Sequence, residues 1–174
     1  MKGNAHNIYL VGPMGSGKTA VGRRLASLLD KEFLDADAEI EKRTGVDVRF
    51  IFEKEGEARF REREREVIAE LTGLDGVVVA TGGGAILDPR NRERLAATGT
   101  VVYLETSVDA LVQRTRSSKT RPLLMNADPR GVLEGLMTVR QPLYEEVADL
   151  KVETTGRTVR AVAADIRDRL TAVP

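Results

Sequence analysis

The residues best suited to chemistry lie near the N-terminus, in the segment GPMGSGKT at residues 12–19. The spacing of its glycines, Lys18 and Thr19 is typical of a phosphate-binding loop, in which backbone N–H groups surround phosphate oxygens. An apolar run at 8–11 precedes the segment and an amphipathic run follows it, as the strand and helix around a phosphate-binding loop require. A glycine-rich turn that contains a lysine by chance would not need these two flanking elements. We therefore expect Lys18 to reach the β- and γ-phosphates of a nucleotide and the Thr19 hydroxyl to bind Mg²⁺.

Two carboxylates, Asp35 and Asp37, follow the short apolar stretch at 32–34. The later apolar run 77–80 ends in Thr81 rather than an aspartate, so a second magnesium ligand must come from elsewhere. Ligands of parallel α/β sheets bind at the carboxyl ends of the strands, and residues two apart in an extended chain point to the same side. One of the two could simply cap the next helix. We expect Asp35 to serve Mg²⁺ or its water shell and Asp37 to accept hydrogen bonds from a substrate hydroxyl.

Three further segments stand out. Three glycines at 82–84 predict either a tight turn or close approach of backbone to a ligand. The charge run FREREREV at 60–67 is typical of a solvated helix with Phe60 and Val67 turned to the core. The polar segment 117–129 carries two prolines between two predicted helices, and connections of this length are usually lids or binding loops.

The elements that must position these residues alternate along the chain. The expected strands are 7–11, 32–34, 77–80, 100–104 and 150–153. The expected helices are 17–29, 37–44, 57–71, 89–97, 108–116, 131–147 and 159–172. Strands separated by helices predict an α/β fold of three layers, α/β/α, with a five-stranded, mostly parallel sheet.

Composition narrows the class of protein. The chain has 174 residues, a length that fits a single domain, 1–174. Its 27 basic and 27 acidic residues balance, which argues against nucleic acid or a membrane surface as a partner. Cysteine is absent, which excludes disulfides and thiolate chemistry. With no apolar run of membrane-spanning length and no leader in sight, we expect a cytoplasmic enzyme that acts as a monomer.

These motifs together resemble those of the shikimate kinases. The resemblance runs from about residue 7 to the last strand, and the ordered combination is far more specific than the P-loop alone. The motifs that carry it are GPMGSGKT at 12–19, DAD at 35–37, EIE at 39–41, RTG at 43–45, EGE at 55–57, Phe60, Arg61, Glu64, ATGGG at 80–84, KTRPLL at 119–124 and RQPLY at 140–144.

The resemblance implies a P-loop NTPase fold with a mobile lid at about 115–129 and a substrate-binding region at about 32–72. It implies transfer of the ATP γ-phosphate to the 3-hydroxyl of shikimate, with Mg²⁺, in aromatic amino acid biosynthesis. ATP and shikimate would be the small-molecule partners.

The resemblance also implies roles for individual residues. Asp37, Lys18 and Arg121 would be catalytic, and Asp37, Arg61, Arg140 and the turn Gly82, Gly83 and Gly84 would bind shikimate. Thr19 and Asp35 would serve the metal. The nucleotide would be bound by Gly15, Ser16, Gly17, Lys18, Thr19, Ala20, Arg114, Arg121 and Arg157. In this picture Arg121 covers the phosphates, Arg114 stacks on the adenine, and the loop near Arg157 contacts the adenine edge.

Two other functions remain open at this stage. One is a kinase of another small hydroxy acid on the same fold, such as gluconate kinase, although a pair of separated arginines favours a carboxylate-bearing ring. The other is a nucleotide-binding regulator without catalysis, although such a protein would have no need to keep both the lid arginine and the second carboxylate.

Overall fold

The structure is a computed structural model that describes residues 6–116 and 128–172. The expected lid falls largely outside these ranges, and so does Arg121. Statements below about the molecule concern the described residues.

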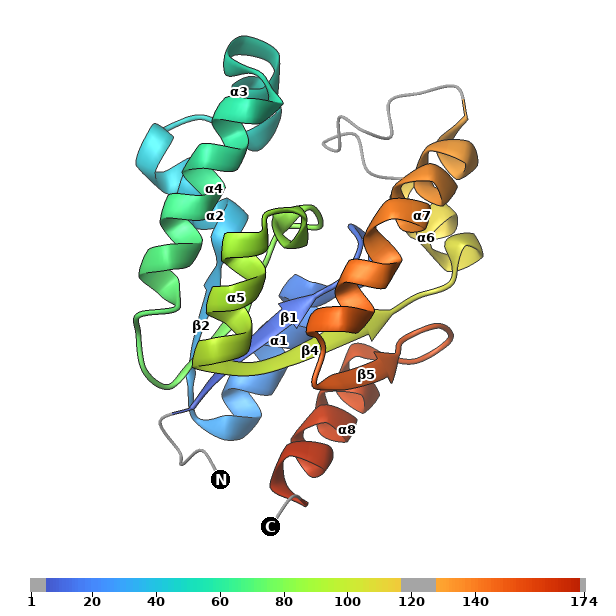
Figure 1. The fold of residues 1–174 in the computed structure, drawn as a ribbon. Coiled ribbons are helices and arrows are strands. Elements are labelled where there is room, and N and C mark those ends of the chain that lie inside the picture. Colours follow the sequence, from blue (N-terminus) through green and yellow to red (C-terminus); the bar gives the residue numbers. More distant parts are fainter. Residues whose placement is uncertain (1–5, 117–127, 173–174) are drawn as a thin grey trace.

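A parallel sheet forms the centre of the molecule (Figure 1). Its five strands lie in the order β2-β3-β1-β4-β5. All four neighbouring pairs are parallel. The strands are β1 (Asn7–Val11), β2 (Glu32–Asp35), β3 (Val77–Ala80), β4 (Gly99–Glu105) and β5 (Leu150–Glu153). The predicted α/β class and parallel sheet are confirmed.

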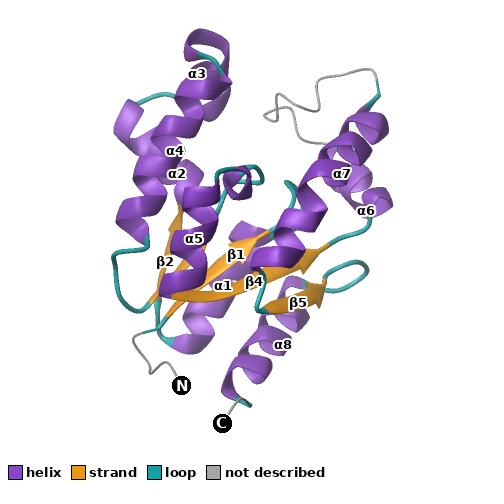
Figure 2. Cartoon of the chain, in the orientation of Figure 1, coloured by secondary structure: helices purple, strands orange, loops and turns teal. Residues whose placement is uncertain are grey.

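Helices cover both faces of this sheet, which makes three layers (Figure 2). They are α1 (Lys18–Leu29), α2 (Ala36–Thr44), α3 (Val48–Glu55), α4 (Glu57–Leu71), the short η1 (Ala85–Leu87), α5 (Pro89–Thr98), α6 (Val108–Thr115), α7 (Pro129–Val147) and α8 (Val159–Thr171). Side chains alternate along β1, so Ile8 and Leu10 pack with α1 and α8, whereas Tyr9 and Val11 pack with α4, α5 and α7. Burial on both faces explains why β3 is apolar throughout and why β1 is hydrophobic after Asn7.

Most predicted element bounds agree with the structure to within two residues, but α3 and η1 were not predicted. The α3 sequence VRFIFEKE is short, and its ends are marked only by the Asp47 side chain, which accepts from Phe50 N, and by Gly56. The prediction that Asp35 and Asp37 point to the same side because both lie in extended chain was wrong. β2 ends at Asp35 and α2 begins at Ala36, so the two residues do not lie in one extended strand.

The parallel arrangement places the candidate chemistry at one edge of the sheet. The P-loop follows β1, Asp35 ends β2 and the glycine turn 82–84 follows β3. These three strands are neighbours in the sheet, so their carboxyl ends meet. The helices α2, α3 and α4 rise beyond this edge on one side, and α6 and α7 on the other (Figure 1).

Candidate active site

A cleft of about 560 Å³ opens at the carboxyl ends of β1, β2 and β3. It is lined by three groups of residues from the P-loop, from α2 to α4, and from the glycine turn with α6 and α7. Of the predicted site residues, it brings together Gly15, Gly17, Lys18, Thr19, Ala20, Asp35, Asp37, Arg61, Gly82, Gly83, Gly84, Arg114 and Arg140.

The P-loop presents backbone to this cleft. Gly15 and Gly17 adopt φ values of 86° and 95°, which L side chains rarely adopt, so glycine is required at both positions. Gly17 is the N-cap of α1 and supplies no capping side chain, which leaves the helix N-terminus suited to an anion. The buried Lys18 ammonium donates to Gly12 O at 2.6 Å and Pro13 O at 2.9 Å. Ser16 is buried and does not line the cleft with its side chain.

An oxygen pair suited to Mg²⁺ lies beside the loop. The Thr19 hydroxyl donates to Asp35 Oδ2 at 2.8 Å, while Asp35 Oδ1 accepts from Ala38 N at 3.0 Å. Asp35 therefore caps α2 and reaches the P-loop at the same time. Hard oxygen donors fit Mg²⁺, which keeps several waters and relies on substrate phosphates for the remaining ligands. Within residues 6–116 and 128–172, no cluster of three or more His, Cys, Asp or Glu side chains could hold a metal ion.

Two carboxyl groups, those of the half-buried Asp37 and the buried Glu64, meet at Gly82. A Cβ added to Gly82 would lie 2.9 Å from Asp37 Oδ1 and 2.9 Å from Glu64 Oε2. Neither oxygen has a hydrogen-bond partner among the described residues. Burial raises the pKa of Asp37 to about 6, with a further contribution from the Asp35 charge and opposition from Lys18. Burial also raises the pKa of Glu64 to about 7, against the lowering effect of Arg61.

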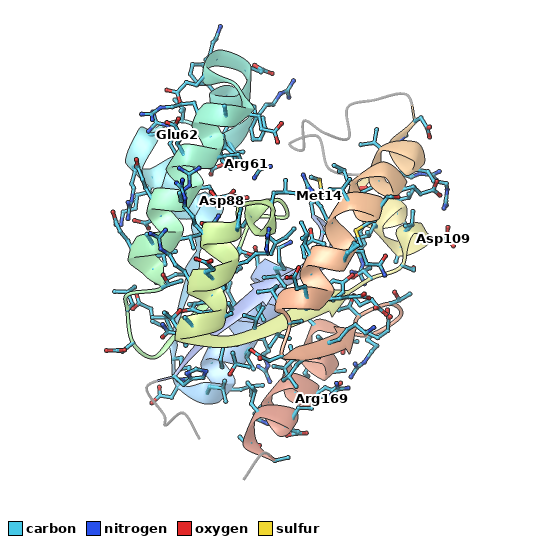
Figure 3. All side chains as sticks on the ribbon, in the orientation of Figure 1. Met14, Arg61, Glu62, Asp88, Asp109 and Arg169 are labelled. Carbon is cyan, nitrogen blue, oxygen red and sulfur yellow. The ribbon has the colours of Figure 1, made fainter. Side chains whose placement is uncertain are left out.

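Two guanidinium groups face the glycine turn from opposite helices. Arg61 on α4 donates to Glu64 Oε1 at 2.9 Å, and Arg140 on α7 is buried. A Cβ on Gly83 would lie 3.5 Å from Arg140 Nη1, and one on Gly84 would overlap the Arg61 guanidinium. Figure 3 shows Arg61 on the side of α4 that faces Met14 of the P-loop, whereas Glu62 lies on another side of the helix. Two guanidinium groups over one turn have the geometry and charge suited to binding a carboxylate.

The arginines expected at the nucleotide base differ in placement. Arg114 on α6 lines the cleft and donates to Gly15 O at 3.0 Å and Thr154 O at 3.3 Å, so it links the P-loop to the segment after β5. The Arg157 side chain lies outside the cleft lining, because it pairs with Asp165 at 3.0 Å and donates to Glu153 O. The backbone N–H of Arg157 donates to Thr154 O, the same residue whose carbonyl accepts from Arg114.

Several cleft residues were not predicted as site residues. Glu64 belongs to the charge run that was interpreted as solvated, yet it is only 1% exposed. Its position four residues after Phe60 and three before Val67 places it on the apolar face of α4, and that spacing was the available signal. Val48, Phe52 and Phe60 also line the cleft, and the first two lie on α3.

Comparison with known proteins agrees with this geometry. The sequence model of the shikimate kinase family matches residues 14–171. The chain belongs to the shikimate kinase family. A shikimate kinase of Halorhodospira halophila is 58% identical over 96% of this chain and 94% of its own length. One of Histophilus somni is 55% identical over 93% of each chain.

Solved structures of this family show the same fold. Shikimate kinase from Acinetobacter baumannii in complex with shikimate superposes with a TM-score of 0.94 at 51% identity, covering 96% of this chain and 93% of that one. The enzyme from Aquifex aeolicus gives a TM-score of 0.82 at 35% identity, covering 95% and 96%. The predicted family and its P-loop fold are confirmed, and the chain is a phosphotransferase with an alcohol acceptor.

Proposed function

We propose that this chain transfers the γ-phosphoryl group of ATP to the 3-hydroxyl of shikimate, giving shikimate 3-phosphate and ADP. The observation that carries the proposal is that one cleft holds both a phosphate-binding loop and, facing it, a carboxylate and two arginines. The first half suits the donor, and the second suits an acceptor that has both hydroxyls and a carboxylate. The reaction is a step of aromatic amino acid biosynthesis.

In the donor half, the P-loop amides from Gly15 to Ala20 bind the phosphates of ATP, and Lys18 supplies positive charge. Its present contacts to Gly12 O and Pro13 O keep the ammonium at the loop, where it exchanges carbonyl oxygens for phosphate oxygens. Thr19 and Asp35 would hold Mg²⁺, which neutralises charge on the transferred phosphoryl group when bound. This proposal is supported by the 2.8 Å Thr19–Asp35 contact.

The remaining nucleotide contacts come from more distant segments. Arg114 is proposed to stack on the adenine, since its guanidinium joins the P-loop to Thr154 at the mouth of the cleft. The segment containing Arg157 contributes backbone rather than its guanidinium, which is occupied by Asp165. Arg121 is proposed as the lid arginine over the phosphates. It lies outside the described residues, so only the KTRPLL motif supports its role.

In the acceptor half, Asp37 receives hydrogen bonds from the shikimate hydroxyls and takes the proton of the attacking one. A pKa near 6 keeps most of this carboxyl ionised at neutral pH while making it more basic than an ordinary aspartate. Arg61 and Arg140 bind the shikimate carboxylate, and Gly82, Gly83 and Gly84 let the substrate approach the backbone. Phosphoryl transfer needs mainly this positioning, with cations around the phosphate.

The proposal is tested by measuring ADP release in a coupled assay with shikimate, with gluconate and with no acceptor. Shikimate is expected to increase the rate by orders of magnitude, with an equal amount of shikimate 3-phosphate formed. Equal or greater turnover with gluconate would favour the other small-acid kinase. ATP binding without any shikimate-dependent turnover would instead favour a regulator.

The same cleft also supports proposals on the domain, the oligomeric state and the substrate-binding segments of this chain. We propose that residues 1–174 form a single domain that works as a monomer, because one chain supplies both halves of the site. Residues 115–129 are proposed as its lid and 32–72 as its shikimate-binding region. Among the described helices, none is both long and apolar enough to cross a membrane. The cytoplasm, where ATP is supplied, is the proposed location, and no nucleic-acid or membrane partner is proposed.

A further inference from the structure

The backbone conformation of Gly84 does not require glycine at this position. It has φ −101° and ψ 6°, a conformation open to L residues with side chains. Its oxygen accepts from Leu87 N at 3.1 Å, a contact that an alanine at this position would also make. The requirement for glycine must therefore come from the space beside its α-carbon.

That space is filled by one group, the guanidinium of Arg61. A Cβ built on Gly84 would lie 2.7 Å from Arg61 Cζ and 2.8 Å from Arg61 Nη1. Both distances are shorter than the contacts that a Cβ makes with non-bonded heavy atoms in proteins. The guanidinium thus rests directly on the bare α-carbon of Gly84. The three nearest atoms to such a Cβ all belong to Arg61.

The guanidinium is also held from its other sides. Its Nη1 donates to Glu64 Oε1 at 2.9 Å and its Nη2 to Glu57 Oε1 at 3.3 Å. The Phe60 ring centroid lies 5.2 Å from Arg61 Cζ, within cation–π range. Since Glu64 is buried, it cannot follow the guanidinium far if the guanidinium is pushed aside.

The preceding residue, Gly83, relates in a similar way to the second arginine. A Cβ on Gly83 would lie 3.5 Å from Arg140 Nη1, an ordinary contact distance. Gly83 O accepts a hydrogen bond from the Tyr144 hydroxyl, which ties the turn to the helix that carries Arg140. Successive positions of one turn therefore face the two guanidinium groups, with Gly83 beside Arg140 and Gly84 beside Arg61.

We propose that Gly84 is a positioning residue for Arg61, whose guanidinium it seats so that Arg61 and Arg140 bind one carboxylate together. The inference rests on the proposed role of these arginines in binding shikimate. It assigns to the last glycine of the turn a function separate from close approach of substrate to the backbone.

The test is the variant Gly84→Ala, measured by steady-state kinetics with shikimate and ATP varied separately. The added methyl group displaces the end of a flexible side chain rather than backbone, so the variant is expected to fold. The KM for shikimate should rise roughly 10- to 100-fold, because binding and catalysis are sensitive to displacements of about 1 Å. The KM for ATP should stay unchanged, because the nucleotide half does not contact Gly84. The matched control is Gly135→Ala on α7, where no atom lies within 4 Å of the added Cβ, and its kinetic constants should equal those of the parent.

A double-mutant cycle distinguishes seating of Arg61 from a general effect on the turn. In an Arg61→Lys background the planar group is gone, so adding Gly84→Ala should change the KM for shikimate by less than about 2-fold. The same large increase in both backgrounds would overturn the proposal, as would an unchanged KM in Gly84→Ala. If Gly84→Ala does not fold, folding of the double variant would still identify the guanidinium as the clash, and failure of both would overturn it.

The outcome is separable from that of the proposed function. If the parent enzyme has no shikimate-dependent activity, the function itself fails. If the parent is active and the cycle shows no coupling between Gly84 and Arg61, only the positioning role fails.

Discussion

At the residue scale, the part of the cleft that faces the P-loop is built from ionisable side chains that are partly or fully removed from water. Asp37 and Glu64 both have a raised pKa because burial disfavours their ionised forms. Their environments differ in the cations that face them. Lys18 and Arg61 lower the pKa of Asp37, whereas Arg61 and Arg140 lower that of Glu64. Glu64 also accepts a hydrogen bond from Arg61, so it affects the position of that guanidinium as well as the local charge.

The first prediction concerns Asp37. Asp37→Asn preserves shape and removes the proton acceptor, so kcat is expected to fall about 10²- to 10⁴-fold. The dissociation constant for shikimate, measured by titration calorimetry, should change far less. Asp75→Asn, at an exposed position, is the control and should leave kcat unaltered. A loss confined to affinity, with kcat retained, would remove the role of Asp37 as base.

The second prediction concerns pH and stability. Glu64 faces Arg61 on its own helix, Asp37 on α2, and Arg140 and Tyr144 on α7. Its folded pKa of about 7 lies above the ordinary value of 4.5, so the folded state binds the proton more tightly. The associated stability is fully present below pH 4.5 and is lost as the pH rises through 7.

This loss should amount to no more than about 3 kcal/mol between pH 4.5 and 8. Glu64→Gln cannot ionise, so its free energy of unfolding should fall less over that interval than that of the parent. Denaturant titrations at both pH values measure the difference. Parallel pH profiles for parent and variant would show that Glu64 does not carry the linkage.

At the element scale, short helices bring apolar residues to the cleft. α3 spans only Val48–Glu55, so its own hydrogen bonds stabilise it weakly, and it depends on its cap and on packing against α4. The Asp47 side chain satisfies Phe50 N at 2.8 Å. Val48 and Phe52 then reach the cleft. The cap at Asp47 therefore contributes indirectly to the shape of the cleft.

The third prediction compares two helix caps. Asp47→Ala and Thr158→Ala each remove a side-chain acceptor at a helix N-terminus, and each should cost about 1 kcal/mol in the free energy of unfolding. Of the two capped helices, α3 lines the cleft and α8 does not, so only Asp47→Ala should raise the KM for shikimate. Thr158→Ala on α8 is thus matched in stability and should not change the kinetics. An equal kinetic effect of both variants would mean that general destabilisation, rather than α3, is responsible.

At the scale of the whole molecule, one sheet edge gathers segments far apart in the chain. The P-loop follows β1, Asp35 ends β2, and Asp37 lies in the first turn of α2. The glycine turn follows β3, and α7 supplies Arg140 from beyond β4. Parallel strands point all their carboxyl ends the same way, so successive βα connections deliver their residues to one place. We propose that one chain completes the cleft, without residues from a second chain.

The fourth prediction follows from that completeness. Specific activity should be independent of enzyme concentration from nanomolar to micromolar levels, and sedimentation should give a mass near 19.0 kDa. Activity that rises with concentration, in step with a larger sedimenting species, would show that the working unit is an oligomer.

Much of this molecule was readable from local patterns. The P-loop spacing, the alternation of apolar and amphipathic runs and the spacing of the glycine turn depend on neighbours within a few residues, so they predicted the sheet, most helices and the donor half. Asp35 makes one contact that the sequence could indicate and one that it could not. Its hydrogen bond from Ala38 N is local, whereas its hydrogen bond from Thr19 joins segments 16 residues apart.

The tertiary structure alone decided what depends on contacts between distant segments. The pairing of Arg157 with Asp165 takes its guanidinium away from the cleft, and no local pattern reports which partner a surface arginine chooses. The burial of Glu64 beside Asp37 depends on α2 and α4 packing against the same turn. The same holds for Gly84. Its glycine is visible in the sequence, but the reason for it is the guanidinium of a residue 23 positions earlier, which only the packed fold brings against its α-carbon.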